Sequence, residues 1–122
     1  MNKFRFLEWE VYRDVKKLVS LVLVITKELP REYRFEPGSQ IIRSAFSVAL
    51  NIAEGSGKTS DKELNRFLEI ALGSAYETLA AIDILKENGF VSEEKYKEIY
   101  NKIYSICNQL GGFKKKVASR RS

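Results

Sequence analysis

The chain has 122 residues, of which 44% are hydrophobic and 30% are charged, with two prolines and no histidine. That length suffices for one hydrophobic core, and the balance of apolar and charged residues favours an ordered, helix-rich protein over a disordered one. The single cysteine excludes an intramolecular disulfide and the lack of histidine removes the ligand sets of the common zinc sites, so we expect no metal and no cofactor.

The N-terminal residues lack the features of a secretory signal, because Lys3, Arg5 and Glu8 interrupt the apolar residues there. The longest apolar run, residues 18–25, is far shorter than the roughly 20 residues that a membrane-spanning helix needs. With one unpaired cysteine, these features predict a cytoplasmic protein with no membrane partner.

The net charge of +5 comes entirely from the C-terminal residues. Residues 1–113 hold equal numbers of basic and acidic side chains, whereas residues 114–122 form a basic tail. Such a terminus is often only a solubilising, frayed end, but it also serves as an arm that contacts phosphates, and both interpretations stay open. The basic residues of the tail are Lys114, Lys115, Lys116, Arg120 and Arg121.

Four segments have the periodicity of amphipathic helices. In the first, residues 9–29, apolar side chains alternate at spacings of four and three, as in the seam of an antiparallel bundle, and Pro30 ends it. The second, residues 37–55, starts with a proline suited to a first helical position and ends at the glycine-rich turn Gly55-Ser56-Gly57.

The third segment, residues 61–88, follows a capping-box signature formed by Ser60 and Glu63, and it ends before Gly89. The fourth, residues 93–117, follows a second N-cap candidate, Ser92. Four such helices joined by short turns predict an all-α fold, an antiparallel up-down-up-down four-helix bundle over residues 1–113.

Apolar side chains also fall on the back of the first helix, where helical periodicity places Trp9, Leu23 and Val24. A tryptophan and two aliphatic side chains on one face indicate a patch that another subunit covers, and so favour self-association. The alternative is that Trp9 folds back over the end of its own bundle. Beside this patch lie the basic side chains of Arg13, Lys16 and Lys17.

The second helix carries a polar stripe beside its apolar seam. Because most of the helix is apolar, we expect part of the stripe to be buried, and a buried polar group without a partner costs about 1 to 3 kcal/mol. These groups should therefore form hydrogen bonds across helices or subunits; contact with a ligand or RNA is the alternative. The stripe consists of Gln40, Ser44, Ser47, Asn51 and Glu54, with Arg43 next to it.

The sequence offers no catalytic constellation. Acid–base and nucleophilic catalysis most often uses histidine or an activated cysteine, and Cys107 lies among apolar residues of the fourth helix, as a core residue would. The run Gly55–Thr59 is similar to a phosphate-binding loop only superficially, because Ile52 stands where that loop has its first glycine. We therefore expect no enzymatic activity.

The stretch from Gln40 to Gly55, continued by Phe67–Ala71, Gly73-Ser74 and Glu77–Leu79, resembles the signature of a bacterial four-helix-bundle family encoded in intervening sequences of 23S ribosomal RNA genes. The resemblance runs from Phe6 to about residue 113. It implies a homopentamer of up-down bundles, with no established enzymatic activity and a suspected association with RNA. The family's polar motif positions have no proven role and fall on Gln40, Arg43, Ser47, Asn51, Glu54, Ser74 and Glu77.

A related bundle is the accessory subunit of diversity-generating retroelements, in which a basic pentamer partners a reverse transcriptase and nucleic acid; the neutral residues 1–113 depart from that relative. We expect a homo-oligomer whose basic groups touch phosphates of RNA or DNA without reading their sequence. The alternative is a structural or protein-partner scaffold, such as an accessory subunit of a nucleic-acid enzyme, that does not bind nucleic acid itself. The expected contacts are Lys114, Lys115, Lys116, Arg120, Arg121, Arg13, Lys16 and Lys17.

Overall fold

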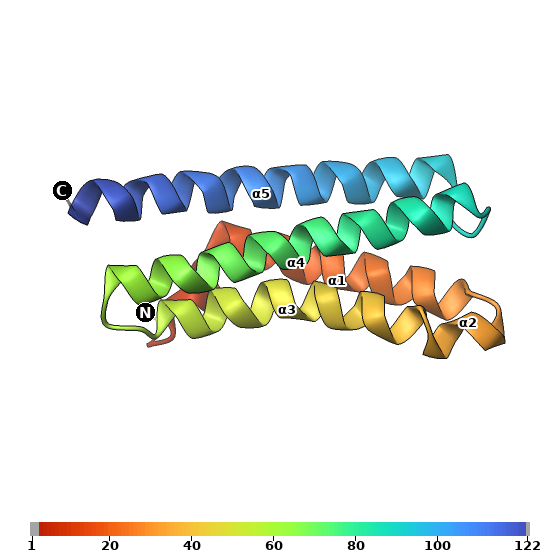
Figure 1. Cartoon of the computed structure of the whole chain (residues 1–122), viewed down its shortest axis with the longest axis horizontal. Helices are drawn as coiled ribbons and strands as arrows, with labels where there is room; N and C mark the ends of the chain where they lie inside the picture. Colours follow the sequence, from red (N-terminus) through yellow and green to blue (C-terminus); the bar gives the residue numbers. More distant parts are fainter. Residues whose placement is uncertain (1–2, 122) are drawn as a thin grey trace.

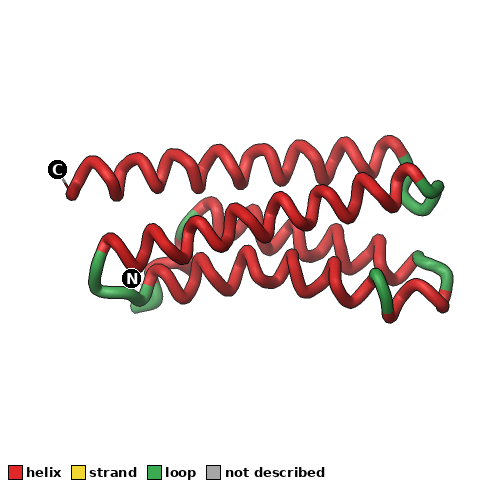
Figure 2. Tube along the Cα trace, viewed as in Figure 1, coloured by secondary structure: helices red, strands yellow, loops and turns green. Residues whose placement is uncertain are grey.

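The computed structural model describes the backbone of residues 3–121 and the side chains of residues 3–119. The regular structure of this part of the chain is helical throughout, which confirms the predicted all-α class (Figure 2). Its elements are a 3-10 turn, η1 (Arg5–Glu8), followed by the α-helices α1 (Glu10–Glu28), α2 (Arg31–Phe35), α3 (Gly38–Ser56), α4 (Asp61–Glu87) and α5 (Glu93–Arg121).

The four long helices form an antiparallel bundle in which successive helices run in opposite directions (Figure 1). Each packs against the next, and α5 packs against α1, so that α1 lies diagonally across from α4. Both described ends of the chain and the turn between α3 and α4 lie at one end of the bundle, which we call the terminal end. The short helix α2 and the turn between α4 and α5 lie at the opposite end, the α2 end.

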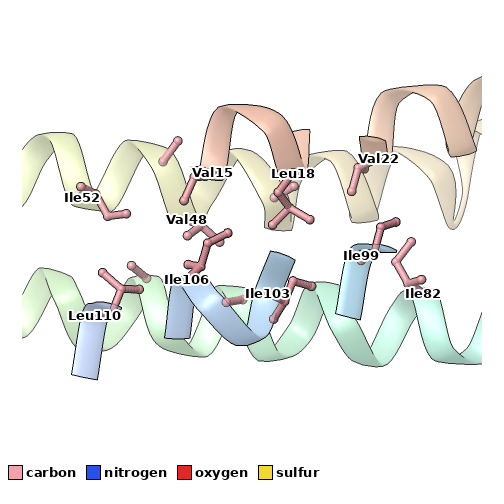
Figure 3. Close-up of a cluster of buried hydrophobic side chains, with 14 of the residues drawn as sticks. Val15, Leu18, Val22, Val48, Ile52, Ile82, Ile99, Ile103, Ile106 and Leu110 are labelled. Carbon is pink, nitrogen blue, oxygen red and sulfur yellow. The ribbon is translucent and has the colours of Figure 1, made fainter. Parts of the chain in front are cut away.

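The apolar seams of the four long helices meet along the bundle axis and form one core (Figure 3). Fully burying a side chain of this size stabilises a fold by about 1.5 to 3 kcal/mol, so these residues supply the main driving force. The labelled core side chains are Val15, Leu18 and Val22 of α1, Val48 and Ile52 of α3, Ile82 of α4, and Ile99, Ile103, Ile106 and Leu110 of α5.

The predicted helix caps are present. The Oγ of Ser60 accepts a hydrogen bond from the backbone N–H of Glu63 at 3.2 Å, and the Oγ of Ser92 accepts one from Lys95 at 3.1 Å. Gly89 ends α4 with a φ of +82°, a left-handed conformation that glycine adopts without strain. The residue after it closes the helix end with a 2.9 Å backbone bond to the carbonyl of Leu85, as in a Schellman motif.

Every predicted helix end except the last lies within one residue of the observed one, but the connection after Pro30 and the C-terminal end of α5 differ from the sequence prediction. The connection after Pro30 contains α2, and Pro37 precedes the first residue of α3 instead of occupying its first helical position. At the other end of the chain, α5 continues past the predicted end at residue 117 to Arg121, so no boundary falls at residue 113.

The last turns of α5 are held by the bundle. Val117 has no exposed surface and belongs to the core, and the Nζ of Lys114 lies 3.2 Å from Oε1 of Glu69 on α4. The frayed-end interpretation is therefore wrong for residues 114–119, because the apolar seam continues through the basic run.

Candidate nucleic-acid interface at the terminal end

Basic side chains from several segments gather in the half of the bundle toward the terminal end, because both described ends of the chain and the α3–α4 turn meet there. Acidic side chains are fewer in that half and outnumber basic ones around the α2 end. Within residues 1–113, basic and acidic side chains nearly balance in each half, so the positive excess at the terminal end comes mainly from Lys114, Lys115 and Lys116. The basic residues of this half with described side chains are Lys3, Arg5, Arg13, Lys16, Lys17, Lys58, Lys62, Arg66, Lys114, Lys115 and Lys116.

The residues predicted to contact nucleic acid divide into engaged and free cations. Arg13 donates to the carbonyl of Glu8 at 2.7 Å, Lys16 lies 5.3 Å from the centre of the Tyr12 ring, and Lys114 pairs with Glu69. Lys17, Lys115 and Lys116 are exposed. The side chains of Arg120 and Arg121 lie outside the described residues. The exposed lysines are thus the cations most available to a phosphate.

Sequence reasoning missed the contribution of the α3–α4 turn and the start of α4. The ammonium of Lys58 and the guanidinium of Arg66 both approach the ring of Phe67, with 5.2 and 4.6 Å to its centre, and Lys62 is exposed. The signal for this cluster was the predicted topology itself, since an up-down bundle of four helices brings both chain ends and the second turn to one end.

The N-terminal segment ties three parts of the terminal end together. Arg5 donates from Nε and Nη2 to the carbonyl of Ser56, at 3.2 and 3.0 Å, and its guanidinium lies 5.4 Å from the centre of the Trp9 ring. The indole in turn packs against Phe113 of α5, with 4.8 Å between ring centres. These contacts join η1, the C-terminal end of α3 and the last third of α5.

The predicted shared patch of Trp9, Leu23 and Val24 is wrong. Trp9 precedes α1 with extended backbone angles and folds over the end of its own bundle, which was the alternative interpretation. Leu23 lies about 21 Å further along the helix axis. Val24 lines a groove with Ile25 and Ile99, on the side of α1 that faces α5. Helical periodicity failed at position 9 because the helix had not yet begun.

The inner members of the polar stripe form the expected interhelical hydrogen bonds. The hydroxyl oxygens of Ser44 and Thr78 lie 2.8 Å apart in a buried position, and those of Ser47 and Ser74 are also 2.8 Å apart. The amide of Asn51 supports the second pair from within α3, by donating to Ser47 Oγ at 3.0 Å. Among the described residues, no buried side-chain oxygen or nitrogen lacks a partner. These hydroxyls join α3 to α4, as the structural interpretation of the stripe predicted.

The outer members of the stripe face solvent. Gln40, Arg43, Glu54 and Glu77 are all exposed. The family's polar motif positions therefore have two different environments, an inner row that holds α3 against α4 and an outer row that is open to a partner.

The remaining groups of chemical interest are not arranged for catalysis. Cys107 is a half-buried free thiol whose pKa is raised by burial, which disfavours the reactive thiolate. Within the described part of the chain, no group of three or more His, Cys, Asp or Glu side chains is placed to hold a metal ion. None of the described helices combines the length and the hydropathy of a membrane span.

The fold and the site together define a small four-helix-bundle protein whose distinctive surface is a basic end. The model of the family described as 23S rRNA-intervening sequence protein matches residues 8–112. The chain belongs to this family, which confirms the resemblance seen in the sequence.

A solved structure supports the same assignment. It is a crystal structure, at 1.70 Å resolution, of a protein with unknown function from the S23 ribosomal protein family of Bacteroides thetaiotaomicron VPI-5482. The two chains are 26% identical with a TM-score of 0.80, and the similarity covers 86% of this chain and 98% of the other. No curated protein matches the chain.

Proposed function

We propose that this protein is a non-enzymatic homo-oligomer that associates with RNA or another nucleic acid through the terminal end of its bundle. The supporting observation is the gathering of basic side chains from η1, α1, the α3–α4 turn, α4 and α5 in one half of the molecule. Lysines and arginines that neutralise phosphates release condensed counterions, and this release drives nucleic-acid binding without any base contact.

The type of side chain favours contact with the backbone over sequence reading. Lys17, Lys115 and Lys116 are flexible point charges on helix surfaces, whereas Arg13 and Arg66 are engaged in contacts within the chain. Phosphate contacts fix position on a nucleic acid, and contacts to base edges give specificity. We therefore expect binding that depends on charge and shape, and that grows stronger when several copies present their basic ends together.

The test is a pair of double variants with matched charge changes, compared by fluorescence anisotropy on a structured RNA and on duplex DNA. Lys115→Gln with Lys116→Gln neutralises two exposed lysines at the terminal end. Arg31→Gln with Lys97→Gln removes two exposed cations near the α2 end and is the control. Substitution is preferable to deletion of the tail, because deletion would also remove the core residue Val117.

The first double variant should weaken binding at low salt and flatten its salt dependence, by up to about 0.9 in the slope of log K against log salt for each lost contact to duplex DNA. The control should bind like the wild type. Equal losses in both variants, or no binding by the wild type at low salt, would contradict the proposal. The second outcome, with assembly intact, would instead favour the protein-partner scaffold.

A further inference from the structure

Two exposed apolar patches lie on different faces of the bundle. The first, the α1/α3 patch, consists of Leu23, Phe46 and Leu50. Phe46 and Leu50 line a groove over Val19 and Ala49, and Leu23 is one helical turn beyond Val19.

The second patch, the tyrosine patch, consists of Tyr76, Tyr100 and Tyr104. These residues line a groove whose floor includes Leu79 and Ile103. The rings of Tyr100 and Tyr104 are nearly parallel, with an angle of 15° between their planes. Exposed apolar side chains that gather over a groove mark an interaction surface.

The two patches lie on opposite faces of the bundle and at the same height. The faces are opposite because α1 packs on α3, α4 packs on α5, and these two pairs form opposite sides of the four-helix arrangement. The heights agree because two hydroxyl pairs align α3 with α4, Ser44 with Thr78 and Ser47 with Ser74. Phe46 lies between the first members of these pairs and Tyr76 between the second members.

Charges beyond the two patches complement each other when two bundles are parallel. One turn past Leu23 toward the α2 end, α1 carries the exposed cation of Lys27. On α4, the exposed acids Asp83 and Glu87 follow Tyr76 toward the same end, since α1 and α4 run in the same direction. They outnumber Lys97, the exposed cation that follows Tyr100 there. If the two bundles were antiparallel, Lys27 of one copy would lie toward the terminal end of its neighbour, away from the neighbour's Asp83 and Glu87. Charge pairs at an interface rim contribute little affinity but fix its orientation.

We infer that the α1/α3 patch of one copy packs against the tyrosine patch of a parallel second copy. This inference rests on the self-association included in the proposed function. A symmetric pairing of like patches would leave the other patch of every copy in water, whereas a head-to-tail contact covers both. Tyrosine and phenylalanine are enriched at interface cores.

Repeating a head-to-tail contact gives a closed ring or an open fibre. Because the copies are parallel, every terminal end lies on the same side of the assembly. The basic halves of all copies would then form one continuous surface, which is the arrangement that strengthens binding to a long polyanion.

The experiment blocks one patch at a time and then combines the blocked chains. Leu50→Glu places a charge in the α1/α3 patch and Tyr104→Glu places one in the tyrosine patch; both positions are 60% exposed, so neither change disturbs the core. Ile84→Glu is the matched control, because Ile84 is 61% exposed but lines the groove between α3 and α4. The mass of each protein, and of the mixture of the first two variants, is measured by light scattering.

Each blocked variant should be monomeric, and their equimolar mixture should form a one-to-one dimer, since Leu50→Glu retains its tyrosine patch and Tyr104→Glu retains its α1/α3 patch. Recovery of association in the mixture also shows that both variants are folded. The control should assemble like the wild type.

Three outcomes would overturn the inference alone while leaving self-association intact. Either blocked variant could still form the wild-type oligomer, or the mixture of the two variants could stay monomeric. The third outcome is that Ile84→Glu dissociates as readily as the blocked variants do. A monomeric wild type would instead overturn the self-association of the proposed function together with this inference. Nucleic-acid binding is measured separately, so its failure is not confused with either result.

Discussion

The hydroxyl oxygens of Ser44 and Thr78 lie 2.8 Å apart at the buried contact between α3 and α4. A carbonyl on the same helix lies near each hydroxyl, that of Ile41 at 2.9 Å from Ser44 Oγ and that of Ser74 at 2.8 Å from Thr78 Oγ1. Because a hydroxyl has one proton, one of the two donates to the other, and the hydroxyl that accepts donates to its own carbonyl. The pair therefore satisfies two polar groups inside an otherwise apolar seam. It also sets the register of the two helices, because a shift of either one would leave both hydroxyls without their interhelical partner.

A single substitution in this pair should lower the free energy of unfolding by more than half of what the double substitution does. Ser44→Ala and Thr78→Val should each lower the free energy of unfolding by about 1 to 2 kcal/mol, because the remaining hydroxyl loses a buried partner. The double variant should lose clearly less than the sum of the two single losses, since no hydroxyl is then left without its interhelical partner. Urea unfolding of the four proteins gives the coupling energy, and additive losses would show that the two hydroxyls act independently.

Two helical glycines should respond in opposite directions to alanine. At Gly55 of α3 a Cβ would lie 2.9 Å from Cβ of Phe67 and 3.3 Å from Cδ1 of Leu64, so Gly55→Ala should destabilise the protein by about 1 to 3 kcal/mol through overpacking. At Gly73 of α4 no atom lies within 4 Å of that position, and Gly73→Ala should stabilise the helix by up to about 1 kcal/mol.

Thermal unfolding of the two glycine variants provides the measurement, with each serving as the control of the other. A stabilised Gly55→Ala would mean that α3 and α4 are less closely packed at the terminal end than the structure shows.

Sequence periodicity predicted the four long helices because their core positions repeat without interruption. The seam Val11, Val15, Leu18, Val22 and Ile25 is buried as expected, and the caps at Ser60 and Ser92 start their helices where the pattern placed them. The end of α5 was predicted in part. Periodicity carried the fourth helix to residue 117, and Val117 is buried, whereas the boundary placed at residue 113 followed the charge along the sequence and burial does not follow it.

The candidate site was only partly predictable, because it is formed by segments far apart in the sequence. The basic run at residues 114–116 was visible directly. Lys58, Lys62 and Arg66 carried no local pattern, and only the meeting of the chain ends with the α3–α4 turn brings them into the same half of the bundle. Trp9 was misplaced for a related reason, since it packs on Phe113 across the bundle and its place in sequence carried no trace of that contact.

The burial of Val117 makes a prediction about the basic run. Val117→Ala removes two buried methyl groups, at about 0.8 kcal/mol each plus a cavity cost, and should destabilise the protein by about 1.5 to 2.5 kcal/mol. Lys115→Ala, at an exposed position two residues earlier, should change stability by less than about 0.5 kcal/mol. Urea unfolding distinguishes them, and equal small effects would mean that the last turns of α5 do not pack on the bundle in solution.

Cys107 reports on the tyrosine patch because its side chain lines the same groove as Tyr76, Tyr100 and Tyr104. Burial raises the pKa of the thiol, so less thiolate is present near neutral pH than for a free cysteine, and alkylation should be slow and should accelerate as pH rises through and beyond the usual cysteine range. A second copy seated on the groove would slow the reaction further. Blocking the α1/α3 patch should therefore speed it up at constant pH, although Leu50 lies on the opposite face of the bundle.

Mass spectrometry of alkylated protein, taken over time, measures this reaction in the wild type, in Leu50→Glu and in Ile84→Glu. The rate in Leu50→Glu should exceed that of the wild type severalfold, whereas Ile84→Glu should match the wild type, because its substitution leaves both patches intact. If folded wild type and folded Leu50→Glu are alkylated at the same rate, the groove around Cys107 is equally open in both proteins. In that case the tyrosine patch would be a surface that the second copy does not cover.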